Sequence, residues 1–225
     1  MLAEKIYFFK ELGFSSLFRS NFENKKISDI AYFKSKLKPY VDDSNILFIH
    51  VPKAAGTSLV KSIYKRQDWC HLTYQDYEKI FDGLIFNSFF KFSFVRNPYS
   101  RFISSYNYLK RSQLFFDKIW TNSNIGDKSI SELLAIFNDL DNVDNLAIDH
   151  FRRQSYFLNG PVDFLGRQES FNDDLIKLSA LIGKDITNIR ENVSDDVNKE
   201  PLCSKDKAII EKIYHSDFEL YETRN

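Results

Sequence analysis

The sequence has 225 residues, with 31 lysines and arginines against 31 aspartates and glutamates, so its formal net charge is zero. This balance excludes binding to nucleic acid or to an anionic membrane through the overall charge of the protein. Hydrophobic residues make up 43% and charged residues 28% of the chain, which is typical of a globular protein. The length favours one domain with a sizeable core.

Residues 1–45 are predicted to be an N-terminal leader or helical extension, and residues 46–225 the main domain. No apolar run approaches the roughly 18 residues that cross a bilayer, and charged residues interrupt the N-terminus, so it lacks a signal-peptide core. We expect Pro39 to break any helix in the Lys-rich residues 25–40. Two cysteines, Cys70 and Cys203, are too few for a disulfide framework or a cysteine-rich zinc site.

The segment Ile46–Leu59, ILFIHVPKAAGTSL, predicts a strand, a tight turn and the start of a helix. The first N–H groups of a helix have no partner within the helix, and the helix dipole favours an anion beside them. Gly56 lets a ligand approach the backbone, and Lys53 adds a positive charge. With the hydroxyl groups of Thr57 and Ser58, the segment predicts a phosphate-binding site.

A second strand-to-helix junction follows the aromatic run Phe89–Val95, which predicts a buried strand parallel to the first. Asn97 suits the helix cap and Pro98 the first helical position, so Arg96 lies at the carboxyl end of a strand, where open α/β sheets bind ligands. Ser104 comes eight residues after Arg96, about two helical turns on. The pair predicts a clamp for a second phosphate.

The remainder of the chain predicts further helices and one more strand. The expected elements are a short helix near Tyr77–Phe81, a loop at Thr121–Lys128, a helix over Ser131–Leu140, a short strand and the start of a helix within Val162–Glu169, a helix ended by Gly183, and a last helix capped by Ser204.

Both junctions resemble nucleotide-binding motifs of sulfotransferases that use 3′-phosphoadenosine 5′-phosphosulfate (PAPS). HVPKAAGTSL is similar to the 5′-phosphosulfate loop of the carbohydrate 2-O- and 4-O-sulfotransferase branch, sulfotransferase family 2. RNPYSRFISSY contains every fixed position of the 3′-phosphate motif R-(N/D)-P-x-x-R-x-x-S-x-Y. The resemblance covers about residues 46–221 and implies a single α/β domain. Its central parallel β-sheet, of about four or five strands, would be flanked by helices in the P-loop NTPase-like sulfotransferase fold.

The resemblance implies sulfuryl transfer from PAPS to an acceptor hydroxyl on a carbohydrate, without a metal ion. Arg96 and Ser104 would hold the 3′-phosphate, and Lys53 would act on the bridging oxygen of the phosphosulfate. The residues expected around the 5′-phosphosulfate are Lys53, Ala55, Gly56, Thr57, Ser58 and Leu59. Animal relatives typically carry an N-terminal membrane span, and this chain shows none, so a bacterial-type, soluble cytoplasmic form is expected.

The acceptor hydroxyl needs a base, and the resemblance favours His71, because relatives often have a His-x-Thr element between the two motifs. The ordinary pKa of imidazole suits proton removal at neutral pH. Glu78 or Asp76 is the alternative, since other branches use a carboxylate. His150 and Gln154 fall in a weaker signature of the family and are expected to face the cleft.

Several alternatives stay open. An ATP-dependent kinase with a P-loop-like fold is less favoured, because the chain lacks the Walker A sequence with Lys directly after the second Gly. A non-catalytic nucleotide-binding relative is a third possibility. The cluster Arg152, Arg153 and Arg167 could bind an acidic glycan or support the core, and the sequence does not choose between these roles or define the oligomeric state.

Overall fold

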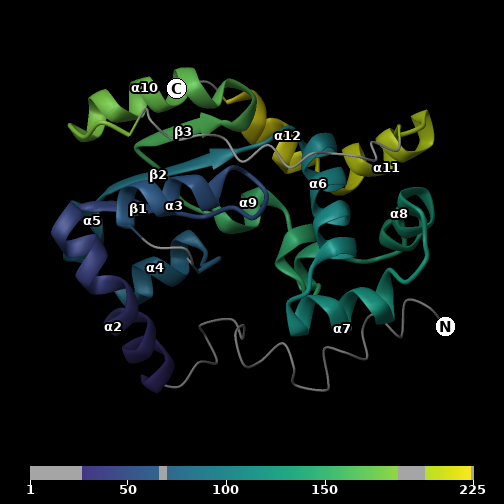
Figure 1. Ribbon diagram of the computed structural model, residues 1–225, viewed down its shortest axis with the longest axis horizontal. Coiled ribbons are helices and arrows are strands. Elements are labelled where there is room, and N and C mark those ends of the chain that lie inside the picture. The colour runs from purple at the N-terminus through teal and green to yellow at the C-terminus, as the bar shows by residue number, and fades with distance from the viewer. Residues whose placement is uncertain (1–26, 66–69, 187–200, 224–225) are drawn as a thin grey trace. The chain divides into compact units, whose positions relative to one another are not determined.

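The computed structural model describes residues 27–65, 70–186 and 201–223, whose helices and strands are labelled in Figure 1. These residues fall into two compact units. The sheet unit contains the described residues of 19–96 and 154–192, and the helical unit contains residues 97–153 and the described residues of 193–223. The predicted leader, residues 1–45, lies partly outside the described residues.

A parallel β-sheet forms the centre of the sheet unit (Figure 1). Its strands are β1 (Ile46–Phe48), β2 (Phe90–Val95) and β3 (Phe164–Arg167), in the order β1-β2-β3. Both neighbouring pairs are parallel, with Ile46 opposite Phe90 and Phe92 opposite Phe164. The predicted parallel sheet is therefore confirmed, although the described residues contain three strands where four or five were expected.

Helices cover both faces of this sheet, because successive strand residues point to opposite sides. Helices α3 (Gly56–Tyr64) and α10 (Phe171–Ile182) share one apolar cluster with Phe48, Phe92 and Phe94. Helices α2 (Ile27–Ser44), α4 (Tyr74–Ile80) and α5 (Gly83–Ser88) share another with Leu47 and Ile49. Two short helical segments, α9 (Gln154–Phe157) and η4 (Gln168–Ser170), flank β3 in the chain. The unit is a three-layered α/β structure.

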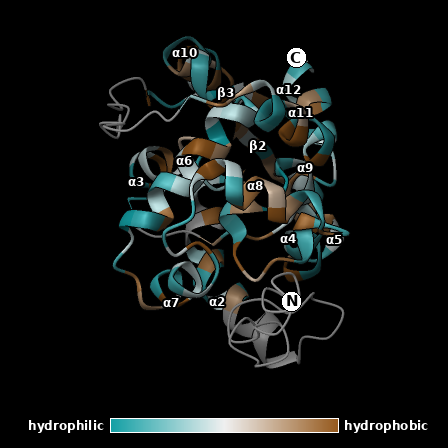
Figure 2. Cartoon of the chain, turned by 90° about the vertical axis from the view of Figure 1, so that its right-hand side faces the viewer, coloured by the Kyte–Doolittle hydropathy of each residue, from teal (hydrophilic) through white to brown (hydrophobic). Residues whose placement is uncertain are grey.

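The helices are amphipathic, as the colouring in Figure 2 makes visible along α10. Leu175 and Leu178 are buried, whereas the polar side chains of Asn172, Asp173 and Lys177 on the same helix are exposed. Gly183 ends α10 with a positive φ of 65°, as its place in the sequence predicts.

The prediction that Pro39 breaks any helix in residues 25–40 is wrong, because Pro39 lies inside α2. Proline cannot donate the backbone hydrogen bond that a helix interior requires. Leu37 and Val41, which flank it, are 2% and 0% exposed and pack into the core. Their burial offsets the lost hydrogen bond while the exposed Pro39 faces solvent.

The helical unit packs five α-helices around one apolar cluster that includes Phe102, Leu133, Phe137, Phe151 and Ile210. They are α6 (Pro98–Arg111), α7 (Phe115–Asn124), α8 (Ile130–Asn138), α11 (Ser204–Ile213) and α12 (His215–Glu222), with the short helical turns η2 (Val143–Asn145) and η3 (Asp149–Phe151).

Two predictions in this unit need correction. The loop expected at Thr121–Lys128 begins later, because α7 continues to Asn124, held by the burial of Trp120 and Ile125. The predicted last helix is α11, which α12 follows, and its cap is Cys203, one residue before the predicted cap; the Cys203 N–H donates to Asp206 Oδ2 at 3.1 Å. Among the described helices, none is long and apolar enough to span a membrane.

Candidate functional site

The turn between β1 and α3 has an unusual backbone. Lys53 and Ala55 both have a positive φ, 67° and 64°, a backbone conformation that is unfavourable for residues with a side chain. Each costs about 1 kcal/mol or more, and such conformations gather at functional sites. Ala55 is the N-cap of α3 and provides no side-chain hydrogen bond to the helix start. In general the first N–H groups of a helix have no partner within the helix, so a helix start of this kind suits an anion.

The residues of this turn differ in what they can offer a ligand. Lys53 and Ser58 are half-buried and Thr57 is exposed. The Leu59 side chain is 0% exposed and packs in the cluster with Phe48 and Phe92, so it anchors α3 on the sheet.

Tyr64, at the other end of α3, fixes this helix to β1. Its hydroxyl donates to the Ile46 carbonyl at 2.8 Å and accepts from the Phe48 N–H at 2.9 Å. Burial raises the pKa of Tyr64 well above its ordinary value, so the hydroxyl keeps its proton. The tyrosine hydroxyl thereby satisfies two backbone groups of β1, the edge strand of the described sheet. It also links α3 to the strand that leads into the turn.

Gly56 is the first residue of α3 and lies against the ring of His50. A Cβ atom at position 56 would come within 1.9 Å of His50 Nε2 and 2.1 Å of Cδ2. No side chain fits there while the ring is in place. Glycine is therefore required by contact with a neighbouring side chain.

His50 also connects this turn to His71, the predicted base. The two rings meet edge to face, with centroids 4.6 Å apart, and the ring of His50 also stacks on Phe48, with centroids 5.4 Å apart. Burial, together with the charge of Lys53, lowers the pKa of His50 to about 3, so the ring is neutral at physiological pH. The sheet unit thus brings His71, Lys53 and Gly56 around one neutral imidazole.

The low pKa of His50 predicts a specific dependence of stability on pH. The unfolded chain binds a proton at His50 near pH 6.5, and the folded chain only near pH 3, so stability falls as the pH falls through this range. The slope is about 1.4 kcal/mol per pH unit, so about 2 kcal/mol is lost between pH 6.5 and 5. Urea unfolding across this range should show a flatter dependence for His50→Phe than for wild type. An equal slope in the two proteins would contradict the burial of a neutral His50, and the exposed His215 supplies a control variant, His215→Phe.

Arg96 lies directly after β2, and β2 is the neighbour of β1 in the sheet. Arg96 and the turn that contains Lys53 therefore each follow the carboxyl end of a strand, and the two strands are adjacent and parallel. The main chain of Arg96 is held by Gln154, which is 0% exposed. Gln154 Oε1 accepts from the Arg96 N–H at 2.9 Å, and its Nε2 donates to the Arg96 carbonyl at 2.8 Å. The expectation that Gln154 faces a cleft is wrong, because both ends of its amide bind the backbone of Arg96.

The second half of this motif belongs to the helical unit. Asn97 caps α6 as predicted, its Oδ1 accepting from the N–H groups of Tyr99 and Ser100 at 3.1 and 3.4 Å, and Pro98 is the first helical residue. Ser104 is 6% exposed on the same helix.

Arg101, the second arginine of the motif, is a structural residue that sequence reasoning missed. It is 2% exposed, and its Nη1 donates to the Arg152 carbonyl at 2.8 Å. Ser105 Oγ donates to the His150 carbonyl at 2.7 Å, and Tyr214 Oη to the Phe151 carbonyl at 2.7 Å. These three donors hold the backbone around η3.

Arg152 and Arg153 also support the structure of the helical unit. Arg152 Nε and Nη2 donate to the Leu146 carbonyl at 3.1 and 2.7 Å. Arg153 forms an ion pair with Asp144, whose hydrogen bond raises the pKa of the guanidinium. Arg167, in the sheet unit, donates its N–H to Asp174 Oδ2 at 2.8 Å. For Arg152 and Arg153 these contacts favour the supporting role over glycan binding.

The carboxylates considered as alternative bases lie at the start and middle of α4. Asp76 forms a capping box with Thr73, since its Oδ2 accepts from the Thr73 N–H at 3.0 Å and its N–H donates to Thr73 Oγ1 at 3.1 Å. Glu78 is exposed. Because Asp76 is engaged in a cap, Glu78 is the freer of the two carboxylates.

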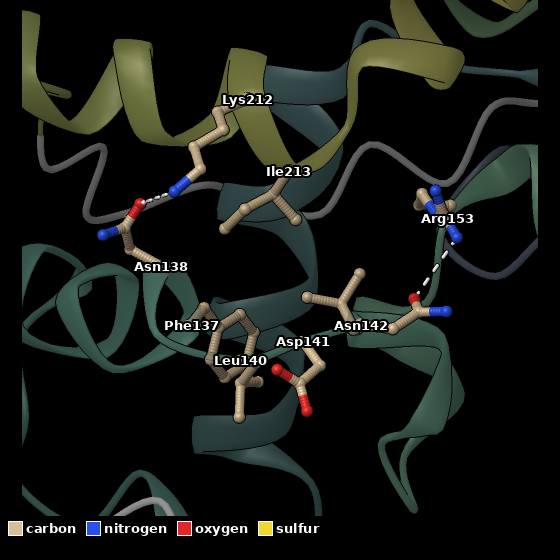
Figure 3. A pocket seen from close by; sticks show the side chains of 9 residues that line it. Phe137, Asn138, Leu140, Asp141, Asn142, Arg153, Lys212 and Ile213 are labelled. Atoms are coloured by element: carbon tan, nitrogen blue, oxygen red, sulfur yellow. Dashed lines mark hydrogen bonds between the residues drawn. The ribbon is translucent and has the colours of Figure 1, made fainter.

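A cavity of about 340 Å³ lies in the helical unit, between α8, the segment after it and α11 (Figure 3). Two hydrogen bonds join residues that line it. Lys212 Nζ donates to Asn138 Oδ1 at 2.9 Å, and Arg153 Nη2 donates to Asn142 Oδ1 at 3.2 Å. Its lining consists of Phe137, Asn138, Leu140, Asp141, Asn142, Val143, Arg153, Lys212 and Ile213. The predicted nucleotide-binding residues and His71 do not line it.

No group of three or more His, Cys, Asp or Glu side chains within the described ranges is arranged to hold a metal ion. Comparisons with curated proteins and with solved structures gave no match. A sequence model described as "Sulfotransferase family" matches residues 40–222, a range that includes both strand-to-helix junctions and His71. The chain therefore belongs to the sulfotransferase family, and its parallel sheet flanked by helices agrees with that fold.

Proposed function

We propose that this sulfotransferase moves the sulfuryl group of PAPS to an acceptor hydroxyl, on a carbohydrate. One observation carries the proposal: the uncapped start of α3 beside Lys53 and the backbone-clamped Arg96 follow the carboxyl ends of two adjacent parallel strands. Two anion sites at one edge of a sheet suit a nucleotide with phosphate groups at both ends of its ribose.

In this proposal the 5′-phosphosulfate binds at the turn before α3, through Lys53, the N–H groups of Ala55–Ser58 and the hydroxyls of Thr57 and Ser58. The fit rests on a helix start that receives no side-chain cap from Ala55 and on the absence of a Cβ at Gly56. The guanidinium of Arg96 takes the 3′-phosphate through paired donors. Ser104 joins it on the basis of the sequence motif alone.

The residues have separate tasks in the transfer. PAPS supplies the sulfuryl group and a phosphate as leaving group. The bond from sulfur to the bridging oxygen breaks as a bond from sulfur to the acceptor oxygen forms, and the acceptor proton passes to His71. Lys53 and the N–H groups at the start of α3 stabilise the negative charge that the leaving phosphate oxygen gains. The contact of His71 with His50, which packs under Gly56, supports a place for the base beside this turn.

The carbohydrate acceptor comes from the resemblance to the 2-O- and 4-O-sulfotransferase branch, which is a weaker basis than the donor residues. No metal ion takes part in the proposed reaction.

Transfer of radiolabelled sulfate from PAPS to a panel of glycans tests the proposal. We expect enzyme-dependent transfer of labelled sulfate to at least one glycan. In a parallel assay with labelled ATP in place of PAPS, we expect no transfer of labelled phosphate. Phosphate transfer from ATP would replace the proposal with a kinase. Tight binding of PAPS with no transfer to any glycan, amine or phenol would indicate a non-catalytic relative.

A further inference from the structure

His50 has a feature that packing alone does not explain. Its side chain is buried, with the residue 9% exposed, and Nδ1 is buried without a hydrogen-bond partner in the described part of the chain. An unpaired polar atom in the interior destabilises the folded protein. A phenylalanine ring would stack on Phe48 and fill the same space without this cost. Packing alone would thus favour a phenylalanine at position 50. We therefore look for the function of the histidine in its other ring nitrogen.

That other nitrogen, Nε2, lies at the phosphate turn. It is the ring atom closest to the Cβ position of Gly56, at 1.9 Å, and Gly56 is the first residue of α3. Gly56 is not among the positive-φ residues of the described chain, so its backbone accepts other residues and the ring alone excludes them. The fold therefore keeps a side chain out of position 56 and keeps an imidazole nitrogen against the helix start.

The backbone fixes this arrangement. The Ile49 N–H donates to the Phe92 carbonyl at 2.9 Å, and the Ile49 carbonyl accepts from Ser93 Oγ at 2.6 Å. The residue before His50 is thereby bound to β2 at both of its polar groups, and the ring itself lies between Phe48 and His71. A donor held this firmly needs little reordering when a ligand arrives.

The chemistry of the ring suits an anion. A neutral imidazole carries its proton on one nitrogen, and placing it on Nε2 leaves the buried Nδ1 as a bare acceptor without an unpaired N–H. Because the ring is neutral, it adds a donor beside Lys53 without like-charge repulsion.

We propose that His50 is a further binding residue of the phosphate turn, whose Nε2–H donates a hydrogen bond to an oxygen of the 5′-phosphate of the bound nucleotide. The inference rests on the proposed function, since it adds a donor to the same site. It gives the turn a neutral donor besides Lys53 and the backbone N–H groups.

Two substitutions at position 50 separate the nitrogen from the ring. His50→Phe keeps an aromatic ring and removes the donor, whereas His50→Gln restores an amide N–H at a similar distance from the backbone. We expect His50→Phe to bind 3′-phosphoadenosine 5′-phosphate about tenfold or more weakly than wild type, the loss typical of a hydrogen bond to a charged group. His50→Gln should bind within about threefold of wild type.

The choice of ligand separates a lost contact from a damaged fold. In calorimetric titrations, 5′-AMP should lose affinity in His50→Phe by the same factor as the bisphosphate, while adenosine, which has no phosphate, should bind as in wild type. His215→Phe, an exposed histidine of α12, is the matched control, and thermal unfolding verifies that each variant is folded.

Equal affinities of wild type and His50→Phe, or equal weakness of the Phe and Gln variants, would overturn the proposal. So would a parallel loss of adenosine binding. If wild type binds no adenosine bisphosphate, the PAPS function fails separately, and inorganic phosphate becomes the probe for His50. Phosphate binding that weakens in His50→Phe and recovers in His50→Gln would support the inference, and unchanged or absent phosphate binding would overturn it.

Discussion

His71→Ala is expected to lower kcat by about 100-fold or more while changing the Kd for 3′-phosphoadenosine 5′-phosphate by less than about twofold. The reason is that general-base catalysis acts on the acceptor hydroxyl in the transition state, whereas in the proposed function Lys53, the start of α3 and Arg96 hold the nucleotide. Steady-state transfer assays and calorimetric titration of the same preparations measure the two quantities.

His215→Ala is the control, since its side chain is 76% exposed and belongs to α12. Near-normal turnover of His71→Ala would remove His71 from the mechanism, and Glu78→Gln would then be the variant expected to lose activity. A joint loss of turnover and nucleotide affinity would indicate that His71 shapes the turn through its contact with His50.

Arg96→Ala is expected to weaken binding of 3′-phosphoadenosine 5′-phosphate by about 10- to 100-fold and to leave 5′-AMP affinity nearly unchanged. A guanidinium that binds the 3′-phosphate has no partner in 5′-AMP, so only the bisphosphate should lose affinity. The backbone at this position should survive the substitution, because Gln154 binds the N–H and carbonyl of residue 96 and not its side chain.

The matched control for this variant is Arg111→Ala, an exposed arginine in the last turn of α6. Equal losses for both nucleotides in Arg96→Ala would assign the arginine to a general electrostatic role. No loss for either nucleotide would remove it from the binding site.

The sequence predicted the two junctions well because each is a local structure. The apolar run before Lys53, the glycine at position 56 and the cap-and-proline pair at Asn97 and Pro98 all act within a few residues, and the structure has the strand-to-helix elements there. The parallel pairing of β1 and β2 also followed, because a helical connection separates them.

The supporting side chains could not be predicted, because their partners are distant in the sequence. Arg101 binds the carbonyl of Arg152, 51 residues away, and Gln154 binds the backbone of Arg96, 58 residues away. A motif shows that an arginine or glutamine is present without showing whether it faces a ligand or the protein backbone. The helix through Pro39 was missed for a similar reason, since tertiary burial of Leu37 and Val41 overrides a local rule.

The position of His50 had a signal in the sequence, since this residue directly follows the first apolar run and lies three residues before Lys53. What could not be foreseen is that its ring lies against Gly56 and against His71 at once. The sequence explained Gly56 by the access it gives to the backbone, whereas the structure shows that the neighbouring imidazole of His50 also requires a glycine there.

Calorimetric titration of the wild-type protein with 3′-phosphoadenosine 5′-phosphate, 5′-AMP and ATP tests the two-phosphate account most directly. The account predicts that the bisphosphate binds at least about tenfold more tightly than either 5′-AMP or ATP, because only the bisphosphate reaches both the turn before α3 and Arg96. ATP binding as tightly as the bisphosphate, or no gain from the 3′-phosphate over 5′-AMP, would contradict it.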